Sequence, residues 1–187
     1  MVDSCCVEGE ENKRGEGMSE LNRCFFSLGS NLGDRLANLR VGWDGLKGLG
    51  QLGTIRCSPI YETEPWGMTR QAWFLNCVVE LATAIEPLEL LNRLKSIEHS
   101  AGRRTHLYRW GPRELDIDIL IYNDRQIKQE LLTIPHRMMT KRRFVLVPLA
   151  DLAPELVIPG TTATVRDTLV ACVDNAKLVR FQSGFNI

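Results

Sequence analysis

The sequence has no excess of charge of either sign, because its 187 residues include 23 Lys and Arg and 23 Asp and Glu. This balance excludes a chain-wide field of the kind that attracts nucleic acid or an anionic membrane surface. Basic residues nevertheless cluster locally, without the long stripe of interleaved aromatics typical of nucleic-acid grooves, which favours a small polyanionic ligand. The two clusters are Arg103, Arg104, Arg109 and Arg113, and Arg137, Lys141, Arg142 and Arg143.

Long apolar runs and ordered cysteine patterns are also missing. No apolar stretch approaches about 18 residues, the length that a membrane-spanning helix requires, and the first twenty residues are too polar for a signal peptide. The six cysteines show no close spacing beyond the adjacent Cys5 and Cys6, which argues against a zinc site or a disulfide framework. We therefore expect a cytoplasmic protein without membrane contacts.

The length of the chain suits one domain with a full hydrophobic core. Residues 1–22 contain so few apolar side chains that we expect a disordered tail. Residues 23–187 are then expected to form a single domain. Because no exposed apolar seam stands out in the sequence, we expect a monomer.

Hydrophobic periodicity and turn residues divide residues 23–122 into six elements. Their order is strand, helix, strand, strand, helix, strand, which predicts an α+β fold with a ferredoxin-like βαββαβ core and a mostly antiparallel sheet. The expected strands are 24–28, 52–61, 74–83 and 115–122, and the expected helices carry the apolar stripes Leu36, Leu39, Trp43 and Leu46, and Leu90, Leu91, Leu94, Ile97 and Ala101.

A C-terminal extension is expected to enlarge this core. Residues 144–149 are interpreted as a short strand, and residues 178–181 as a strand that closes the sheet. Thr164 and Asp167 have the spacing of a capping box, which predicts a helix that runs to Cys172.

Two carboxylates stand on the last strand of the core. Successive side chains of a strand point to opposite faces, so Asp116 and Asp118 share one face and Ile117 and Ile119 the other. Their roots lie roughly 7 Å apart, which allows both to bind one Mg²⁺ or to share a pair of ions in phosphoryl transfer. The alternative is that one or both cap a turn or pair with a neighbouring arginine on a solvated face.

Seven segments in a fixed order resemble the 6-hydroxymethyl-7,8-dihydropterin pyrophosphokinase family. Enzymes of this family transfer pyrophosphate from ATP to a pterin alcohol in folate biosynthesis. The resemblance covers about residues 23–159 and implies an ATP-dependent transferase with Mg²⁺ as cofactor. The segments are Ser27 to Asp34, Tyr61 to Gly67, Phe74 to Asn76, Gly102 with Arg103, Trp110 to Asp118, Ile134 to His136, and Arg142 to Phe144.

The resemblance implies that Asp116 and Asp118 bind two Mg²⁺ ions, with Asp116 also close to the pterin hydroxymethyl group. Arg103 and Arg113 would meet the ATP phosphates, where a planar guanidinium binds paired oxygens better than a lysine. These four residues are the predicted catalytic group. The remaining residues implied to hold ATP are Glu98, Arg109, Ile119, His136 and Arg142.

The resemblance also implies a pterin pocket. Trp110 and Phe144 would sandwich the flat heterocycle, and Asn76 would supply both a donor and an acceptor for its amide and amino edge. Thr63 and Trp66 would shape the pocket. The family's pattern departs at a few places, including Phe74 where a tyrosine is frequent; the others are Glu64, Thr105, His106 and Arg137.

Two other functions are compatible with an Asp-x-Asp strand on such a fold. One is another metal-dependent transferase, such as a nucleotidyltransferase, which would release pyrophosphate and not AMP. The other is a catalytically silent ligand-binding module, for which the retention of both aspartates with both arginines would be unexpected.

Overall fold

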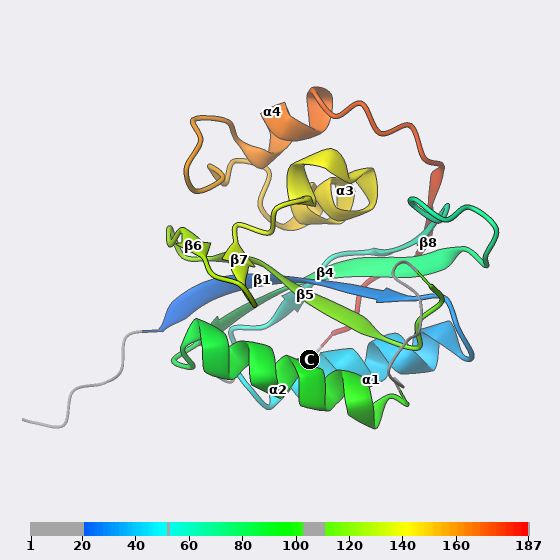
Figure 1. Ribbon diagram of the computed structural model, residues 1–187, viewed down its shortest axis with the longest axis horizontal. Helices are drawn as coiled ribbons and strands as arrows, with labels where there is room; N and C mark the ends of the chain where they lie inside the picture. The colour runs from blue at the N-terminus through cyan, green and yellow to red at the C-terminus, as the bar shows by residue number, and fades with distance from the viewer. Residues whose placement is uncertain (1–20, 52, 103–110, 187) are drawn as a thin grey trace, which may run out of the picture.

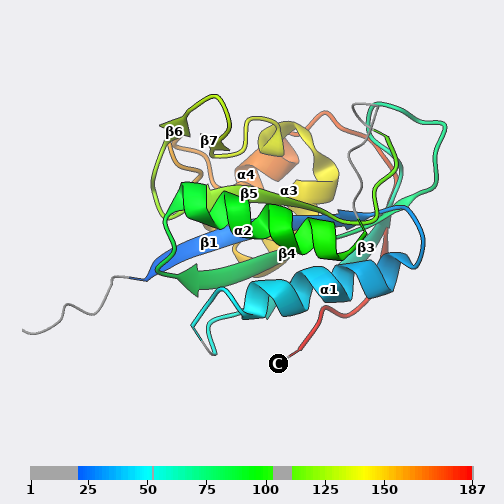
Figure 2. The ribbon, with the colours of Figure 1, turned by 60° about the horizontal axis from the view of Figure 1, so that its bottom comes forward.

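The computed structural model describes residues 21–51, 53–102 and 111–186. A central sheet lies between two layers of helices (Figure 1). The helices α1 (Arg35–Lys47) and α2 (Pro87–Ser100) cover one face, and Figure 2 shows them side by side in front of the sheet. The helix α3 (Arg143–Leu152) packs on the other face, and α4 (Val165–Val170) lies against α3.

The sheet is antiparallel at every pairing of the described strands, in the order β5-β1-β4-β3-β8. The central position of β1 between β5 and β4 is the arrangement of a ferredoxin-like βαββαβ core, so the expected α+β class and core topology are confirmed. Within the described residues, no helix is both long and apolar enough to cross a bilayer. The strands are β1 (Asn22–Ser30), β2 (Arg56–Cys57), β3 (Ile60–Thr63), β4 (Phe74–Thr83), β5 (Asp116–Tyr122) and β8 (Leu178–Gln182), with a separate pair β6 (Ile127–Lys128) and β7 (Thr133–Ile134) and a 3₁₀ turn η1 (Met139–Lys141).

Both faces of the sheet are buried. Along β1, Phe26 and Leu28 join the core beneath α1 and α2, whereas Phe25 joins the core beneath α3. A strand that is covered on both faces can carry consecutive apolar residues, and residues 24–26 of β1 and 119–121 of β5 are such buried apolar runs.

The expectation of a strand at residues 144–149 is wrong, because this segment forms α3. A short apolar run rich in β-branched residues cannot be assigned by periodicity alone. Here Val145 and Leu149 are buried one helical turn apart against the second face of the sheet. The backbone N–H of Arg143 is capped by the Asp174 carboxylate at 2.9 Å, which is a partner that no local sequence signal indicates.

The strand expected at residues 52–61 is divided into β2 and β3, both paired with β4. Pro59 has no N–H for the ladder. Ser58 connects this break to β4, since its N–H donates to the Val78 carbonyl and its hydroxyl accepts from the Val78 N–H, both at 2.9 Å. The expected tail of residues 1–22 is one residue too long, because β1 begins at Asn22. The capping box at Thr164 and the strand β8 are confirmed.

Candidate active site

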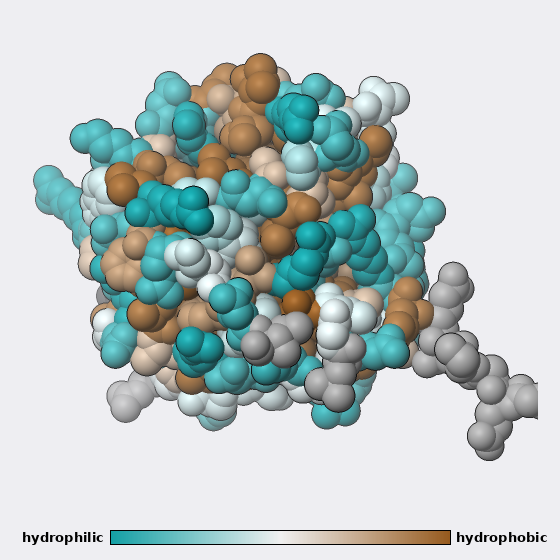
Figure 3. All heavy atoms as spheres, turned by 180° about the vertical axis from the view of Figure 1, so that it is seen from behind, coloured by the Kyte–Doolittle hydropathy of each residue, from teal (hydrophilic) through white to brown (hydrophobic). Residues whose placement is uncertain are grey.

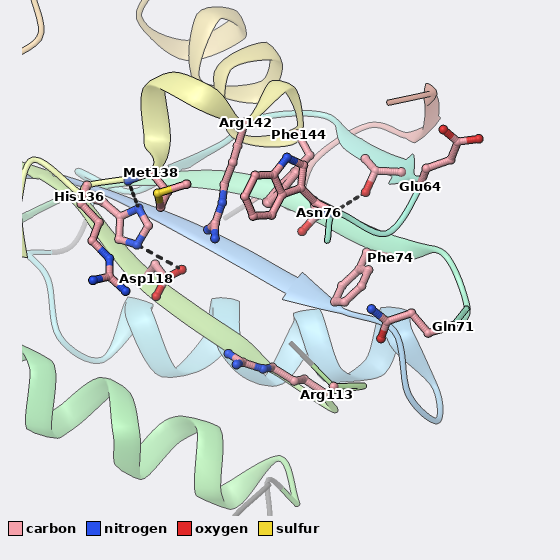
Figure 4. Close-up of a pocket in the computed structure, with 14 residues that line it drawn as sticks. Glu64, Gln71, Phe74, Asn76, Arg113, Asp118, His136, Met138, Arg142 and Phe144 are labelled. Atoms are coloured by element: carbon pink, nitrogen blue, oxygen red, sulfur yellow. Dashed lines mark hydrogen bonds and ion pairs between the residues drawn. The ribbon is translucent and has the colours of Figure 1, made fainter. Parts of the chain in front are cut away.

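Two acidic side chains stand at the beginning of β5. Asp116 and Asp118 keep 25% and 35% of their side-chain surface exposed, while Ile117 between them is buried on the α2 side. The expected alternation is therefore present. Figure 4 shows the Asp118 side chain close to His136, on the same side of the sheet as Arg142 and Phe144.

Glu98 of α2 fastens the backbone between these aspartates. Its Oε1 accepts a hydrogen bond from the Ile117 N–H at 2.8 Å, and its Oε2 accepts one from Lys95 Nζ at 2.9 Å. The side chain is only 1% exposed, and burial raises the pKa of Glu98 although Lys95 opposes the shift. The structure thus places Glu98 behind β5, where it supports the segment that carries the carboxylates.

The two aspartates differ in their electrostatic surroundings. Arg113 Nη1 donates to Asp116 Oδ1 at 2.5 Å, and although burial opposes the charge of Arg113, this ion pair raises its pKa above the ordinary value. Burial and the neighbouring carboxylate of Asp116 raise the pKa of Asp118 to about 6. Negative charge at Asp118 is therefore costly in the free protein, and a bound cation would relieve it.

His136 faces Asp118 as a neutral imidazole. Burial, together with the charges of Arg142 and Arg137, lowers the pKa of His136 to about 4. Its Nδ1 accepts a hydrogen bond from the Met138 N–H at 3.4 Å, which leaves the ring proton on Nε2. This Nε2 lies 4.0 Å from Asp118 Oδ2. His136 can therefore donate a hydrogen bond to an anion beside Asp118 without adding a positive charge.

A cavity of about 550 Å³ opens between β3, β4, β5 and the start of α3. Its size lies within the range of small-molecule sites. Figure 4 shows Asp118 and His136 at one end and Phe74 and Asn76 towards the other. The lining residues are Thr63, Glu64, Trp66, Gln71, Phe74, Asn76, Gly111, Arg113, Asp118, His136, Arg137, Met138, Arg142 and Phe144.

The amide of Asn76 is held in one orientation within this cavity. Asn76 is 4% exposed, and its Nδ2 donates to Thr63 Oγ1 at 2.6 Å. Gly29 on the neighbouring strand leaves room for this amide, because a Cβ there would lie 2.7 Å from Asn76 Oδ1. A fixed amide beside aromatic rings suits a flat heterocycle with a polar edge.

Aromatic and cationic groups meet at the centre of the same cavity. The Arg142 guanidinium lies 5.0 Å from the centre of the Trp66 ring and 5.6 Å from that of Phe144. Burial lowers the pKa of Arg142, while Asp118 and Asp116 oppose the shift. The positive charge of Arg142 therefore interacts with the negative charges of the two aspartates.

A second cavity, of about 480 Å³, lies on the other side of Asp118 between α2 and the β6–β7 segment. Ile119 and Lys95 contribute to its wall. The two cavities share Asp118, His136 and Arg137. Two ligands bound side by side would therefore meet at Asp118.

The structure brings most of the predicted site residues together. The first cavity is lined by five residues that the sequence analysis assigned to a pterin pocket, namely Thr63, Trp66, Phe74, Asn76 and Phe144. The sequence did not point to Gln71, Met138, Leu91, Asn92, Lys95, Glu130, Leu131, Leu132 or Thr133 as cavity residues. Of these, only Lys95 carried a signal, because it lies one helical turn before Glu98 on the same helix face. The predicted residues Arg103, Arg109 and Trp110 lie outside the described residues.

The donor set fits a divalent cation such as Mg²⁺. Carboxylate oxygens are its preferred protein ligands, and Mg²⁺ commonly takes one or two carboxylates and fills its remaining positions with phosphate oxygens and water. Asp116 and Asp118 supply these two carboxylates. Among residues 21–51, 53–102 and 111–186, no group of three or more His, Cys, Asp or Glu is placed to form a closed metal cage.

The model of the 7,8-dihydro-6-hydroxymethylpterin-pyrophosphokinase (HPPK) family matches residues 25–154, which include both cavities and β5. The chain belongs to this family. It is therefore a transferase, and its activity is pyrophosphoryl transfer to a hydroxymethyldihydropterin in folate biosynthesis.

Two bacterial relatives show how much of the chain is shared. The 2-amino-4-hydroxy-6-hydroxymethyldihydropteridine pyrophosphokinase of Methylorubrum extorquens is 44% identical over 149 residues, which are 80% of this chain and 92% of the relative. The protein of the same name from Bacillus subtilis is 42% identical over 142 residues, or 76% of this chain and 84% of the relative. The HPPK unit of these relatives is thus nearly complete in this chain.

A solved structure supports the fold independently. The HPPK-DHPS of Plasmodium falciparum (A437G variant) superposes with a TM-score of 0.63 at 18% identity. The alignment covers 82% of this chain and 46% of the Plasmodium chain, so this chain spans about half the length of that structural relative. The likeness shows the shared HPPK fold.

Proposed function

We propose that this chain binds 6-hydroxymethyl-7,8-dihydropterin in the first cavity and MgATP in the second, and that Asp116 and Asp118 hold two Mg²⁺ ions between them. The proposal rests on one observation above the others, namely that the two cavities share Asp118. A hydroxymethyl group that points out of the first cavity would then face phosphate groups that enter from the second.

The residues of the chain position the two substrates and stabilise charge. The pterin hydroxymethyl oxygen attacks the β-phosphorus of ATP, the bond between this phosphorus and the α,β-bridging oxygen breaks, and AMP leaves. Arg113, Arg142 and neutral His136 surround the transferred group and offer N–H donors to its oxygens. Bound Mg²⁺ would offset the negative charge of the phosphate oxygens. The protein is asked for positioning and charge stabilisation, and not for covalent chemistry.

The nucleotide product tests the proposal. Purified protein mixed with ATP, Mg²⁺ and 6-hydroxymethyl-7,8-dihydropterin is expected to form AMP, which chromatography detects. AMP formation is expected to stop when EDTA removes Mg²⁺. Pyrophosphate as the product would instead indicate a nucleotidyltransferase. Tight pterin binding without turnover would indicate a silent ligand-binding module.

Asn76→Ala is expected to weaken pterin binding far more than ATP binding. The substitution removes the amide that is oriented by Thr63, and the lost hydrogen bonds correspond to a roughly 10-fold or larger loss of pterin affinity. Calorimetry with each ligand measures both affinities. Asn175→Ala is the matched control, because Asn175 is exposed and lies in neither cavity wall. Equal losses for the two ligands would contradict the assignment of the first cavity to the pterin.

We further propose that the enzyme acts as a monomer in the cytoplasm, apart from nucleic acid and membranes. Both cavities are lined by described residues of one chain, which supports a site within a single subunit. Hydrophobic and hydrophilic side chains are interspersed on the face seen in Figure 3, which supports a solvated surface. The free thiols of Cys24, Cys57, Cys77 and Cys172 suit a reducing compartment.

A further inference from the structure

Asn31 connects the walls of the site on both sides of β1. It follows the last residue of β1, which is the strand between β4 and β5, and it is 4% exposed. Its Nδ2 donates to Gln71 Oε1 at 3.0 Å and to the Ala72 carbonyl at 3.1 Å, in the segment that leads into β4. Its Oδ1 accepts from the Arg113 N–H at 2.8 Å, and its own N–H donates to the Arg113 carbonyl at 3.0 Å.

Both partners of Asn31 line the first cavity, and Arg113 also reaches a carboxylate of β5. Gln71 lines the first cavity and is itself fixed, since its Nε2 donates to the Met68 carbonyl at 2.8 Å. Arg113 pairs with Asp116 at the carboxylate end of β5. Both Nδ2 donors and the Oδ1 atom of the Asn31 amide take part in this bridge, so neither side can shift without disturbing the orientation of the amide.

We propose that Asn31 is a positioning residue that couples the pterin cavity to the phosphate-binding end of β5. A ligand that orders the segment around Gln71 also orders Arg113 through Asn31, so the second ligand then binds with a smaller loss of conformational freedom. Binding at each site is expected to raise the affinity at the other by the same factor. This inference rests on the proposed function, because it assigns the pterin and ATP to these two sides.

The test measures this coupling factor by calorimetry. The pterin is titrated into the protein alone and into the protein saturated with Mg²⁺ and α,β-methylene-ATP, in which the bond that would break is replaced by a carbon bridge. In the wild-type protein the nucleotide analogue is expected to tighten pterin binding at least about 5-fold. In Asn31→Ala the factor is expected to fall below about 2-fold, while each ligand alone binds within about 3-fold of the wild-type affinity.

Two further variants make the test specific. Asn38→Ala removes a nearby asparagine at the start of α1, whose amide donates to the Leu32 carbonyl at 2.9 Å and to Ser30 Oγ at 3.3 Å, and this variant is expected to retain the coupling. Asn31→Asp keeps an acceptor for the Arg113 N–H but loses the donors to Gln71 and Ala72, so it is expected to lose the coupling. This variant decides the question if circular dichroism shows that Asn31→Ala does not fold.

The possible results separate the inference from the proposed function. Wild-type protein that binds both ligands without coupling, or an Asn31 variant that folds and retains the coupling, would overturn the role of Asn31 and leave the proposed function intact. Wild-type protein that binds neither the pterin nor the nucleotide analogue would overturn the proposed function, and the inference with it.

Discussion

Asp118→Asn is expected to lower kcat about 100- to 1,000-fold, the scale found when one charge-stabilising group is removed from an active site. The substitution keeps the size of the side chain and replaces a charged oxygen by an amide nitrogen, which is a poor ligand for Mg²⁺. Asp118 is the acidic residue that both cavities share, so its loss affects the place where the two substrates would meet.

The same substitution is expected to leave the folded protein as stable as before, or more stable. In the free protein, burial and the Asp116 carboxylate both disfavour a negative charge at Asp118 and raise its pKa. A neutral amide removes this repulsion. Thermal unfolding without metal therefore measures whether Asp118 serves activity at the expense of stability, and a Tm several degrees below the wild-type value would contradict this account.

Asp124→Asn is the matched control for Asp118→Asn. Asp124 is exposed, and it lies just beyond the other end of β5, away from both cavities of the site. The same chemical change at this position is expected to leave kcat and the Mg²⁺ requirement unchanged. Near-wild-type kcat in Asp118→Asn at saturating Mg²⁺ would sink the assignment of Asp118 as a metal ligand.

The core of the fold could be predicted from the sequence because local signals agree there with the global packing. The stripe from Leu90 to Leu94 indicates which face of α2 is buried, and Pro87 indicates where this helix begins. The alternation at Asp116 and Asp118 survives in β5 for the same reason, since any one-residue shift would place a carboxylate in the core beneath α2.

The errors occurred where tertiary contacts override local preference. Residues 144–149 favour a strand by composition, but they form a helix because the second face of the sheet requires a cover and Asp174 caps the helix from a distance. The second cavity was also beyond sequence reasoning. Its wall combines Lys95 of α2 with Leu131 and Thr133 of the β6–β7 segment, and this proximity exists only after the chain has folded.

The role of Asn31 illustrates a further limit of motif reasoning. The turn from Ser27 to Asp34 indicates a strand that leads into a helix, which β1, the Asp34 cap and α1 confirm. The partners of Asn31, however, lie 40 and 82 positions away along the chain. A motif can show that a turn is present, but only the paired strands on both sides of β1 show what the turn holds together.

Arg113→Ala is expected to lower kcat about 100- to 1,000-fold, like the removal of other charge-stabilising donors. The loss has two causes. The guanidinium that pairs with Asp116 at 2.5 Å disappears, and with it a planar donor that can bind two phosphate oxygens at once. Arg113→Lys is expected to recover only part of the rate, because an ammonium group restores the charge but not the two parallel donors.

Arg125→Ala is the matched control for this prediction, because Arg125 is also paired with a carboxylate, that of Glu86 at 2.8 Å, but on the exposed surface. Exposed ion pairs contribute little to stability, about 0–1 kcal/mol, so kcat and Tm are expected to stay close to wild type. Steady-state kinetics of the three variants separates charge from geometry at Arg113. Full activity in Arg113→Lys would show that charge alone suffices there, whereas full activity in Arg113→Ala would remove Arg113 from the catalytic group and leave Arg142 and His136 as the described donors to the transferred phosphate.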